Sequence, residues 1–195
     1  MDTSKILANI NQSVKLNKTE TDFLESILIP RPYKQGEVIV KSGETARYMM
    51  FVNSGYLMTY FTDKDGNDHV IQFAAEGWWA GDLYSLSQKQ TTIFTTKGLS
   101  DGELLLLPRI SQDKLFELHP VFERYFRITF QTSVMRNQLR FIENFSETAE
   151  ERYRAFLAKF PGMQQYVPQK HIASFLGITP EFLSKIRSKS SKKQS

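Results

Sequence analysis

Short apolar runs alternate with turn residues through the middle of the chain, from Gly36 to Pro108. The runs are rich in β-branched and aromatic side chains, and clusters of Gly, Asp, Asn and Ser separate them. This pattern is typical of short antiparallel strands joined by tight turns, as in a β-barrel or β-sandwich. We expect strands over residues 37–41, 48–52, 56–61, 69–74, 91–96 and 104–107.

Helical spacing of apolar residues precedes and follows this region. Residues 2–28 carry apolar side chains three and four positions apart, and Pro30 and Pro32 end that pattern. After Pro108 we expect a short helix and then a long one over residues 119–145. The predicted fold class is therefore α+β, with an N-terminal antiparallel β-roll of jelly-roll type and helices at both ends.

The long helix carries a continuous apolar stripe. Its members follow one another at alternating steps of four and three residues: Val121, Tyr125, Ile128, Thr132, Met135, Leu139 and Ile142. Such a 3.5-residue repeat is typical of a coiled coil, and Phe122, Phe126 and Phe130 lie beside it. One face would pack on the β-roll and the other on a second copy of the chain. A single wide stripe in a monomer gives similar spacing, but the continuity of the repeat favours a homodimer.

The sequence after the long helix predicts three helices, of which the last two form a helix-turn-helix. The first would start at Ser146, its N-cap, and end near Phe160 before a Pro-Gly pair. In the helix-turn-helix, Gly177 suits the left-handed conformation that ends one helix, and Thr179 and Pro180 suit the start of the next. The predicted division is a sensor β-roll (1–118), a dimerisation helix (119–145) and a DNA-binding unit (146–195).

The last of these helices would lie in the DNA major groove, with its N-terminal residues on base edges. Glu181 would accept a hydrogen bond from a cytosine, and Lys185 would reach a guanine or a phosphate. The remaining polar and basic side chains would contact the phosphate backbone. The predicted contacts are Thr179, Pro180, Glu181, Ser184, Lys185, Arg187 and Lys189. An ordinary helical hairpin with a charged solvent face is the alternative.

Charge is distributed unevenly along the chain. Residues 1–145 hold 16 Lys/Arg and 17 Asp/Glu, a net charge of −1, whereas residues 146–195 hold 9 and 4, a net charge of +5. A basic segment on a neutral body indicates a polyanionic partner, although a solvated tail has the same composition.

Several function classes are disfavoured by residues that the sequence lacks. The sequence contains no cysteine, so a disulfide, a zinc-thiolate site and a cysteine-bound iron–sulfur cluster are all excluded. His69, His119 and His171 are isolated, so we expect surface or capping roles for them, no metal site and no cupin-like metalloenzyme. Haem ligation by one of them is the alternative. No nucleophile–base or phosphate-loop motif is present, and we expect no enzyme. No signal peptide or membrane-length apolar run is present, so we expect a cytoplasmic protein without a membrane partner.

Motifs along nearly the whole chain resemble the Crp/Fnr family of transcription regulators, in particular the small Crp-like members of Bacteroidetes. The matching residues are Gly36-Glu37, Ser42-Gly43-Glu44, Tyr48 with Gly55, Gly81-Asp82-Leu83, Asp101-Gly102-Glu103-Leu104, and Ile172-Ala173 through Arg187. The resemblance implies a cyclic-nucleotide-binding-type β-roll, a dimerisation helix and a helix-turn-helix. It also implies a palindromic double-stranded DNA operator and RNA polymerase as partners. A sensor module that regulates a protein partner without binding DNA is the alternative.

The resemblance also implies an effector pocket in the β-roll. Its residues would be Gly81, Asp82, Leu83, Thr91, Thr92 and Thr132. Members that bind cyclic AMP hold the ribose with a Glu and the phosphate with an Arg; here Asp82 replaces the Glu, and residues 89–92 contain no Arg. Losing that guanidinium removes a strong charge-assisted bond, and Trp78 and Trp79 would narrow the pocket. We therefore expect a different small-molecule effector, or none.

The end of the chain departs from the family as well. Family members have a β-hairpin wing after the recognition helix, but here the sequence ends within ten residues of Ile186. We expect a helix-turn-helix that lacks a wing, with a flexible basic tail providing the phosphate contacts.

Overall fold

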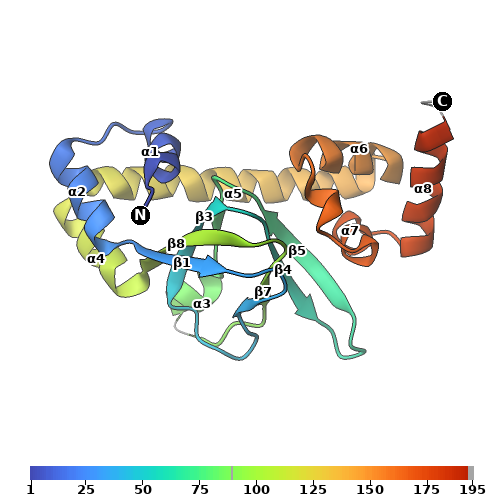
Figure 1. The fold of residues 1–195 in the computed structure, drawn as a ribbon, viewed down its shortest axis with the longest axis horizontal. Helices are drawn as coiled ribbons and strands as arrows, with labels where there is room; N and C mark the ends of the chain where they lie inside the picture. Colours follow the sequence, from blue (N-terminus) through green and yellow to red (C-terminus); the bar gives the residue numbers. More distant parts are fainter. Residues whose placement is uncertain (89, 193–195) are drawn as a thin grey trace.

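Figure 1 shows a β-roll in the middle of the molecule, with helices at both ends, and one long helix, α5, that runs beside the roll from one group of helices to the other. This computed structural model describes residues 1–88 and 90–192. Helices α1, α2 and α4 lie at one end, and α6, α7 and α8 lie at the other. The helices are α1 (Ser4–Asn11), α2 (Lys18–Ile27), α3 (Leu83–Gln88), α4 (Arg109–Leu118), α5 (Pro120–Ser146), α6 (Ala149–Lys159), the 3₁₀ turn η1 (Met163–Gln165), α7 (Gln169–Leu176) and α8 (Pro180–Lys192).

Two antiparallel sheets form the roll, with the strand orders β1-β8-β3-β6 and β2-β7-β4-β5. Apolar side chains from both sheets, among them Ile39, Val52 and Leu57, pack together as one core. The fold class predicted from the sequence is confirmed. The strands are β1 (Ile29–Tyr33), β2 (Val38–Val40), β3 (Tyr48–Ser54), β4 (Leu57–Thr62), β5 (Asp68–Ala74), β6 (Trp79–Ala80), β7 (Thr95–Gly98) and β8 (Gly102–Pro108).

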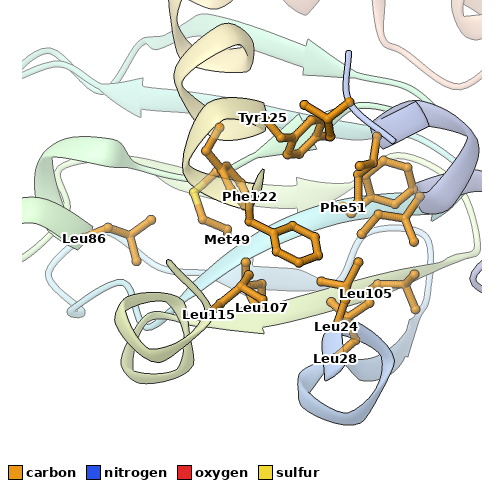
Figure 2. Close-up of a cluster of buried hydrophobic side chains, with 14 residues drawn as sticks. Leu24, Leu28, Met49, Phe51, Leu86, Leu105, Leu107, Leu115, Phe122 and Tyr125 are labelled. Carbon is orange, nitrogen blue, oxygen red and sulfur yellow. The ribbon is translucent and has the colours of Figure 1, made fainter. Parts of the chain in front are cut away.

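Strands β3 and β8 are buried on both faces, which explains their unbroken apolar runs. Met50 and Val52 of β3 contribute to the core between the sheets. Their neighbours Met49 and Phe51 instead pack with the helices, because successive side chains of a strand point to opposite faces. Figure 2 shows this second core, where β3 and β8 meet residues of α2, α3, α4 and α5 such as Phe122. The helices are therefore anchored on the outer face of the first sheet.

Three strands differ from the prediction: β1 and the two-residue β6 were not predicted, and β7 starts later than expected. Strand β1 was not predicted, because Pro30 and Pro32 lack the N–H group that a central strand needs. Its place at the sheet edge, paired with β8 alone, is where proline is tolerated. Strand β7 begins at Thr95, later than predicted, because Thr91 forms only an isolated bridge to Thr45.

The N-cap of α6 is not the residue that the sequence predicted. Ser146 is the last residue of α5 and not an N-cap. Thr148 caps α6 instead: its hydroxyl accepts the N–H of Glu151 at 3.3 Å, and the Glu151 carboxylate accepts the N–H of Thr148 at 2.8 Å. This reciprocal capping box gives α6 a start that is independent of α5.

Candidate nucleic-acid interface and sensor cavity

Helices α7 and α8 form the helix-turn-helix that the sequence predicts. Gly177 ends α7 with φ +67°, and the N–H of Ile178 donates to Ala173 O at 3.0 Å. The Thr179 hydroxyl accepts the N–H of Phe182 at 3.2 Å, and Pro180 is the first residue of α8. Gly177 in the left-handed conformation and the N-cap Thr179, two residues later, together turn the chain from α7 into α8.

The buried and exposed faces of α8 are clearly separated. Leu183 and Ile186 are buried against α6 and α7, with Ala173 fully buried where the helices cross. All seven predicted DNA contacts are exposed on the rest of the helix surface: Thr179, Pro180, Glu181, Ser184, Lys185, Arg187 and Lys189. A further exposed residue that the sequence analysis did not select is Phe182. Its aromatic ring lies among the polar side chains and could contact a thymine methyl group.

Glu181 is held in its charged form. Its own backbone N–H, at the start of α8, lowers the pKa of the Glu181 carboxyl, and the Thr179 hydroxyl lowers it further. A carboxylate accepts hydrogen bonds and cannot donate them. At this position Glu181 therefore suits a donor such as the amino group of cytosine.

The basic C-terminus is helical over its described part. Helix α8 continues to Lys192, so the prediction of a flexible tail from Arg187 onward is wrong for residues 187–192. Residues 193–195 lie outside the described part of the chain. No strand follows α8 within residues 1–88 and 90–192, and the described segment contains no wing.

The helix-turn-helix packs directly on the roll. Ser174 of α7 bonds the edge strand β5 twice: its hydroxyl donates to Asp68 O and accepts the N–H of Val70, both at 3.0 Å. Beside these two hydrogen bonds, Phe73 of β5 makes aromatic contacts with Phe156, Phe160 and Phe175. The hydrophobic core of the DNA-binding unit thus extends into the roll, across the boundary that the sequence suggested.

Helix α5 also contacts β5 and α7. Arg140 of α5 donates from Nη1 to Ile71 O on β5 at 2.7 Å, and its guanidinium lies 4.9 Å from the ring centroid of Phe175. Helix α5, strand β5 and helix α7 are therefore joined around one side chain.

A cavity of about 670 Å³ lies between the roll, α1, α5 and the DNA-binding unit. Three of the predicted effector residues, Gly81, Leu83 and Thr132, line it, as do Trp78 and Trp79. The tryptophans thus form part of the cavity wall, as expected. Its volume falls within the range of small-molecule sites.

The other three predicted effector residues do not line the cavity. Asp82 starts α3: its Oδ1 accepts the N–H groups of Tyr84 at 3.0 Å and Ser85 at 3.3 Å. Thr92 is buried, and its hydroxyl accepts the N–H of Phe94. Thr91 is held by its bridge to Thr45. The Asp82 and Thr92 side chains thus stabilise local turns, and none of the three residues lines this cavity.

The predicted dimer stripe divides into two parts. Tyr125 is 1% exposed, and its hydroxyl accepts from Trp79 Nε1 at 2.7 Å and donates to Asn9 Oδ1 at 2.6 Å. Its assignment to the dimer interface is therefore wrong, because the side chain is part of the core of a single chain. Val121 also packs against that core, and Ile128 and Thr132 are half-buried. Only Met135, Leu139 and Ile142 are exposed.

The three histidines lie in unrelated surroundings. His69 Nε2 bonds Asp63 at 2.6 Å in the β4–β5 turn, and this bond is the main cause that lowers the pKa of Asp63 to about 2. His119 contacts Phe23 and Phe122, and His171 is buried between α7 and β4, beside Tyr60. Within the described residues, no three His, Asp or Glu side chains are grouped as metal ligands. None of the described helices is long and apolar enough to cross a membrane.

Comparison with known proteins agrees with this architecture. The family model of the cyclic nucleotide-binding domain matches residues 30–119, which span β1 to β8 and α4. The transcriptional activator protein FnrA of Stutzerimonas stutzeri is 24% identical, over 92% of this chain and 78% of its own length. The electron transport regulator A of Shewanella oneidensis is 22% identical, over 88% of this chain and 72% of its own length.

Solved structures show the same fold. FixK2 from Bradyrhizobium japonicum superposes with a TM-score of 0.73 at 20% identity, over 86% of each chain. The catabolite activator protein of Thermus thermophilus gives a TM-score of 0.58 at 20% identity, over 92% of this chain and 85% of that one. The chain therefore shares the fold of these solved structures, its residues 30–119 match the cyclic nucleotide-binding domain, and over most of its length it is similar to transcription regulators such as FnrA.

Proposed function

We propose that this chain is a homodimeric, effector-responsive transcription regulator that reads a palindromic DNA operator through α8. It would act in the cytoplasm, with RNA polymerase as a further partner. The observation that carries the proposal is the separation of faces on α8, where Leu183 and Ile186 hold the helix and every predicted DNA contact is exposed. This is the arrangement of a recognition helix that enters the major groove.

Homodimerisation is supported by the outer part of α5. Val134, Met135, Leu139, Phe141 and Ile142 are all more than half exposed, although they are large and apolar. A soluble monomer rarely exposes so many large apolar side chains on one helix. A second copy packed on this face would form a two-fold interface and place two recognition helices for two half-sites.

The effector is expected to differ from cyclic AMP. Family members that bind cyclic AMP carry a Glu at the position of Asp82. Here Oδ1 of Asp82 accepts two backbone N–H groups at the start of α3, and the described part of the following loop provides no Arg. A thermal-shift measurement with cyclic AMP tests this directly, because a ligand that binds only the folded state raises its melting temperature. We expect no shift beyond that of an uncharged nucleoside.

The experiment that tests DNA reading is fluorescence anisotropy with DNA from upstream of the protein's own coding region. Lys185→Ala removes a predicted contact, and Lys114→Ala, on the distant helix α4, removes the same charge from an exposed site. We expect specific affinity to fall by about tenfold for Lys185→Ala, as for the loss of one good base contact, and to be unchanged for Lys114→Ala. Equal affinity in both variants would contradict the recognition-helix assignment. Absence of specific binding in the parent chain would favour a sensor that acts on a protein partner.

A further inference from the structure

The wall of the large cavity carries more positive charge than its surroundings neutralise. Among the described residues its lining includes four cations, Lys5, Arg136, Arg140 and Lys159, and one carboxylate, Glu76. Glu76 is already paired with Lys5 at 2.8 Å. The other three cations, called here the cationic cluster, have no carboxylate within ion-pair distance among the residues described.

The cationic cluster is held together by aromatic rings. The Arg136 guanidinium and the Lys159 ammonium each lie 5.4 Å from the ring centroid of Trp78. Arg140 lies over Phe175 and is bonded to the β5 backbone. Cation–π contacts orient these groups, but a ring carries no net charge and cannot neutralise them.

The cations also destabilise one another. Partial desolvation lowers the pKa of Lys159, and the charge of Arg136 and that of Arg140 lower it further, while Glu143 raises it. Desolvation likewise lowers the pKa of Arg140. Arg136 and Lys159 are exposed and Arg140 is half-buried, so the repulsion among the three charges is partly screened by solvent. A bound anion would relieve what remains of it.

The cluster joins two parts of the molecule. Arg136 and Arg140 belong to α5, whereas Lys159 is the last residue of α6 in the DNA-binding unit. We propose that the cavity binds a small organic polyanion, with carboxylate or phosphate groups on Arg136, Arg140 and Lys159, and that this ligand is the effector. The inference rests on the proposed function, because it assigns the effector to a site that bridges the dimer helix and the DNA-binding unit.

The test uses the full chain with citrate and inorganic pyrophosphate as probes, at an ionic strength held constant with sodium chloride. Lys159→Met removes the charge and keeps an apolar side chain beside Trp78. Lys114→Met, outside the cavity, is the matched control. We expect at least one probe to raise the melting temperature of the parent and of the control beyond the chloride reference. We expect its affinity, measured by calorimetry, to fall about tenfold in Lys159→Met, as for one lost charge-assisted contact.

Arg136→Gln provides a second variant if Lys159→Met folds poorly, and the same loss of affinity is expected. If neither probe stabilised the parent beyond chloride, or if a probe stabilised parent and variants equally, the proposal would be overturned. A variant that is less stable by the same amount with and without the probe would indicate a structural role alone, and would also overturn it.

The effector role has its own readout. At constant ionic strength, the bound probe is expected to change the operator affinity of the parent several-fold and to leave that of Lys159→Met unchanged. Polyanion binding without any change in DNA affinity would contradict the effector role. If the parent chain bound the polyanion but no specific DNA, the proposed function would be contradicted and the anion site would still stand. The two failures are therefore distinguishable.

Discussion

The two halves of α5 carry the same apolar repeat but meet different surroundings. In the first half, Phe122, Tyr125 and Phe126 are buried against the roll and its N-terminal helices. In the second half, Leu139, Ile142 and their apolar neighbours are exposed. One periodicity thus contributes first to the core of a single chain and then to a surface suited to a second chain. The apolar spacing alone does not distinguish the two halves, whereas the fold shows that only the first is covered within one chain.

The largest effect is expected in the buried half. Phe122→Ala removes a fully buried ring from the core in Figure 2 and should lower the free energy of unfolding by about 3–5 kcal/mol, as for other large-to-small core substitutions. Phe141→Ala is its counterpart in the exposed half and should change the stability of the monomer by less than about 0.5 kcal/mol. Urea denaturation at low protein concentration measures both. Similar losses would erase the distinction between the two halves.

A charge placed in the exposed half should separate the chains. Leu139→Glu would bury an unpaired carboxylate in the proposed interface, which costs several kcal/mol, so the dimer dissociation constant should rise by about 100-fold or more. Leu118→Glu is the matched control, since Leu118 is also an exposed leucine but lies on α4. Sedimentation equilibrium gives both constants. Equal dimerisation by the two variants would place the interface elsewhere.

The contact between the roll and the DNA-binding unit should be weakened selectively by Ser174→Ala. The change leaves Asp68 O and the N–H of Val70 without their partner, at a cost of about 1–2 kcal/mol. Hydrogen exchange at Val70 should accelerate by about tenfold, whereas Ser188→Ala, on the exposed face of α8, should leave it unchanged. Unaltered protection at Val70 in Ser174→Ala would show that the aromatic contacts alone hold the two parts together.

A smaller effect should follow pH. Burial, and then the positive charge of Lys170, lower the pKa of His171 below its ordinary value of 6.5; Asp68 raises it and Lys97 lowers it slightly. The unfolded chain therefore takes up a proton first as pH falls, so stability is full above pH 6.5 and declines below it. Melting temperatures of the parent should fall more steeply from pH 7 to pH 5 than those of His171→Gln. Parallel slopes would show that His171 does not contribute.

The sequence predicted the elements better than their contacts. The strands, the long helix and the cap at Thr179 follow from local spacing and turn chemistry. Strand β1 was missed because Pro30 and Pro32 are compatible with a strand only at a sheet edge, and edges are set by pairing with distant β8. Tyr125 was assigned to the wrong surface for a similar reason, since its partners Asn9 and Trp79 are remote in sequence.

The candidate site shows the same limit. All seven residues selected at α8 are exposed, because helical periodicity and two buried anchors, Leu183 and Ile186, determine which side chains point outward. Phe182 was missed, because an aromatic side chain was expected to be buried. Only three of the predicted effector residues, Gly81, Leu83 and Thr132, line the large cavity. Its lining is brought together by the packing of α5 and α6 on the roll, and no local motif connects Arg136 with Lys159.

The most direct measurement is the number of chains bound to an operator. Sedimentation of the full chain with a fluorescent palindromic duplex from its upstream region should show two chains of 22.6 kDa per duplex, with cooperative binding and a steep loss of affinity as salt increases. Leu139→Glu should require a much higher protein concentration for the same complex. One chain per duplex, or equal affinity for the palindrome and for a scrambled duplex, would contradict a dimer that reads DNA through two copies of α8.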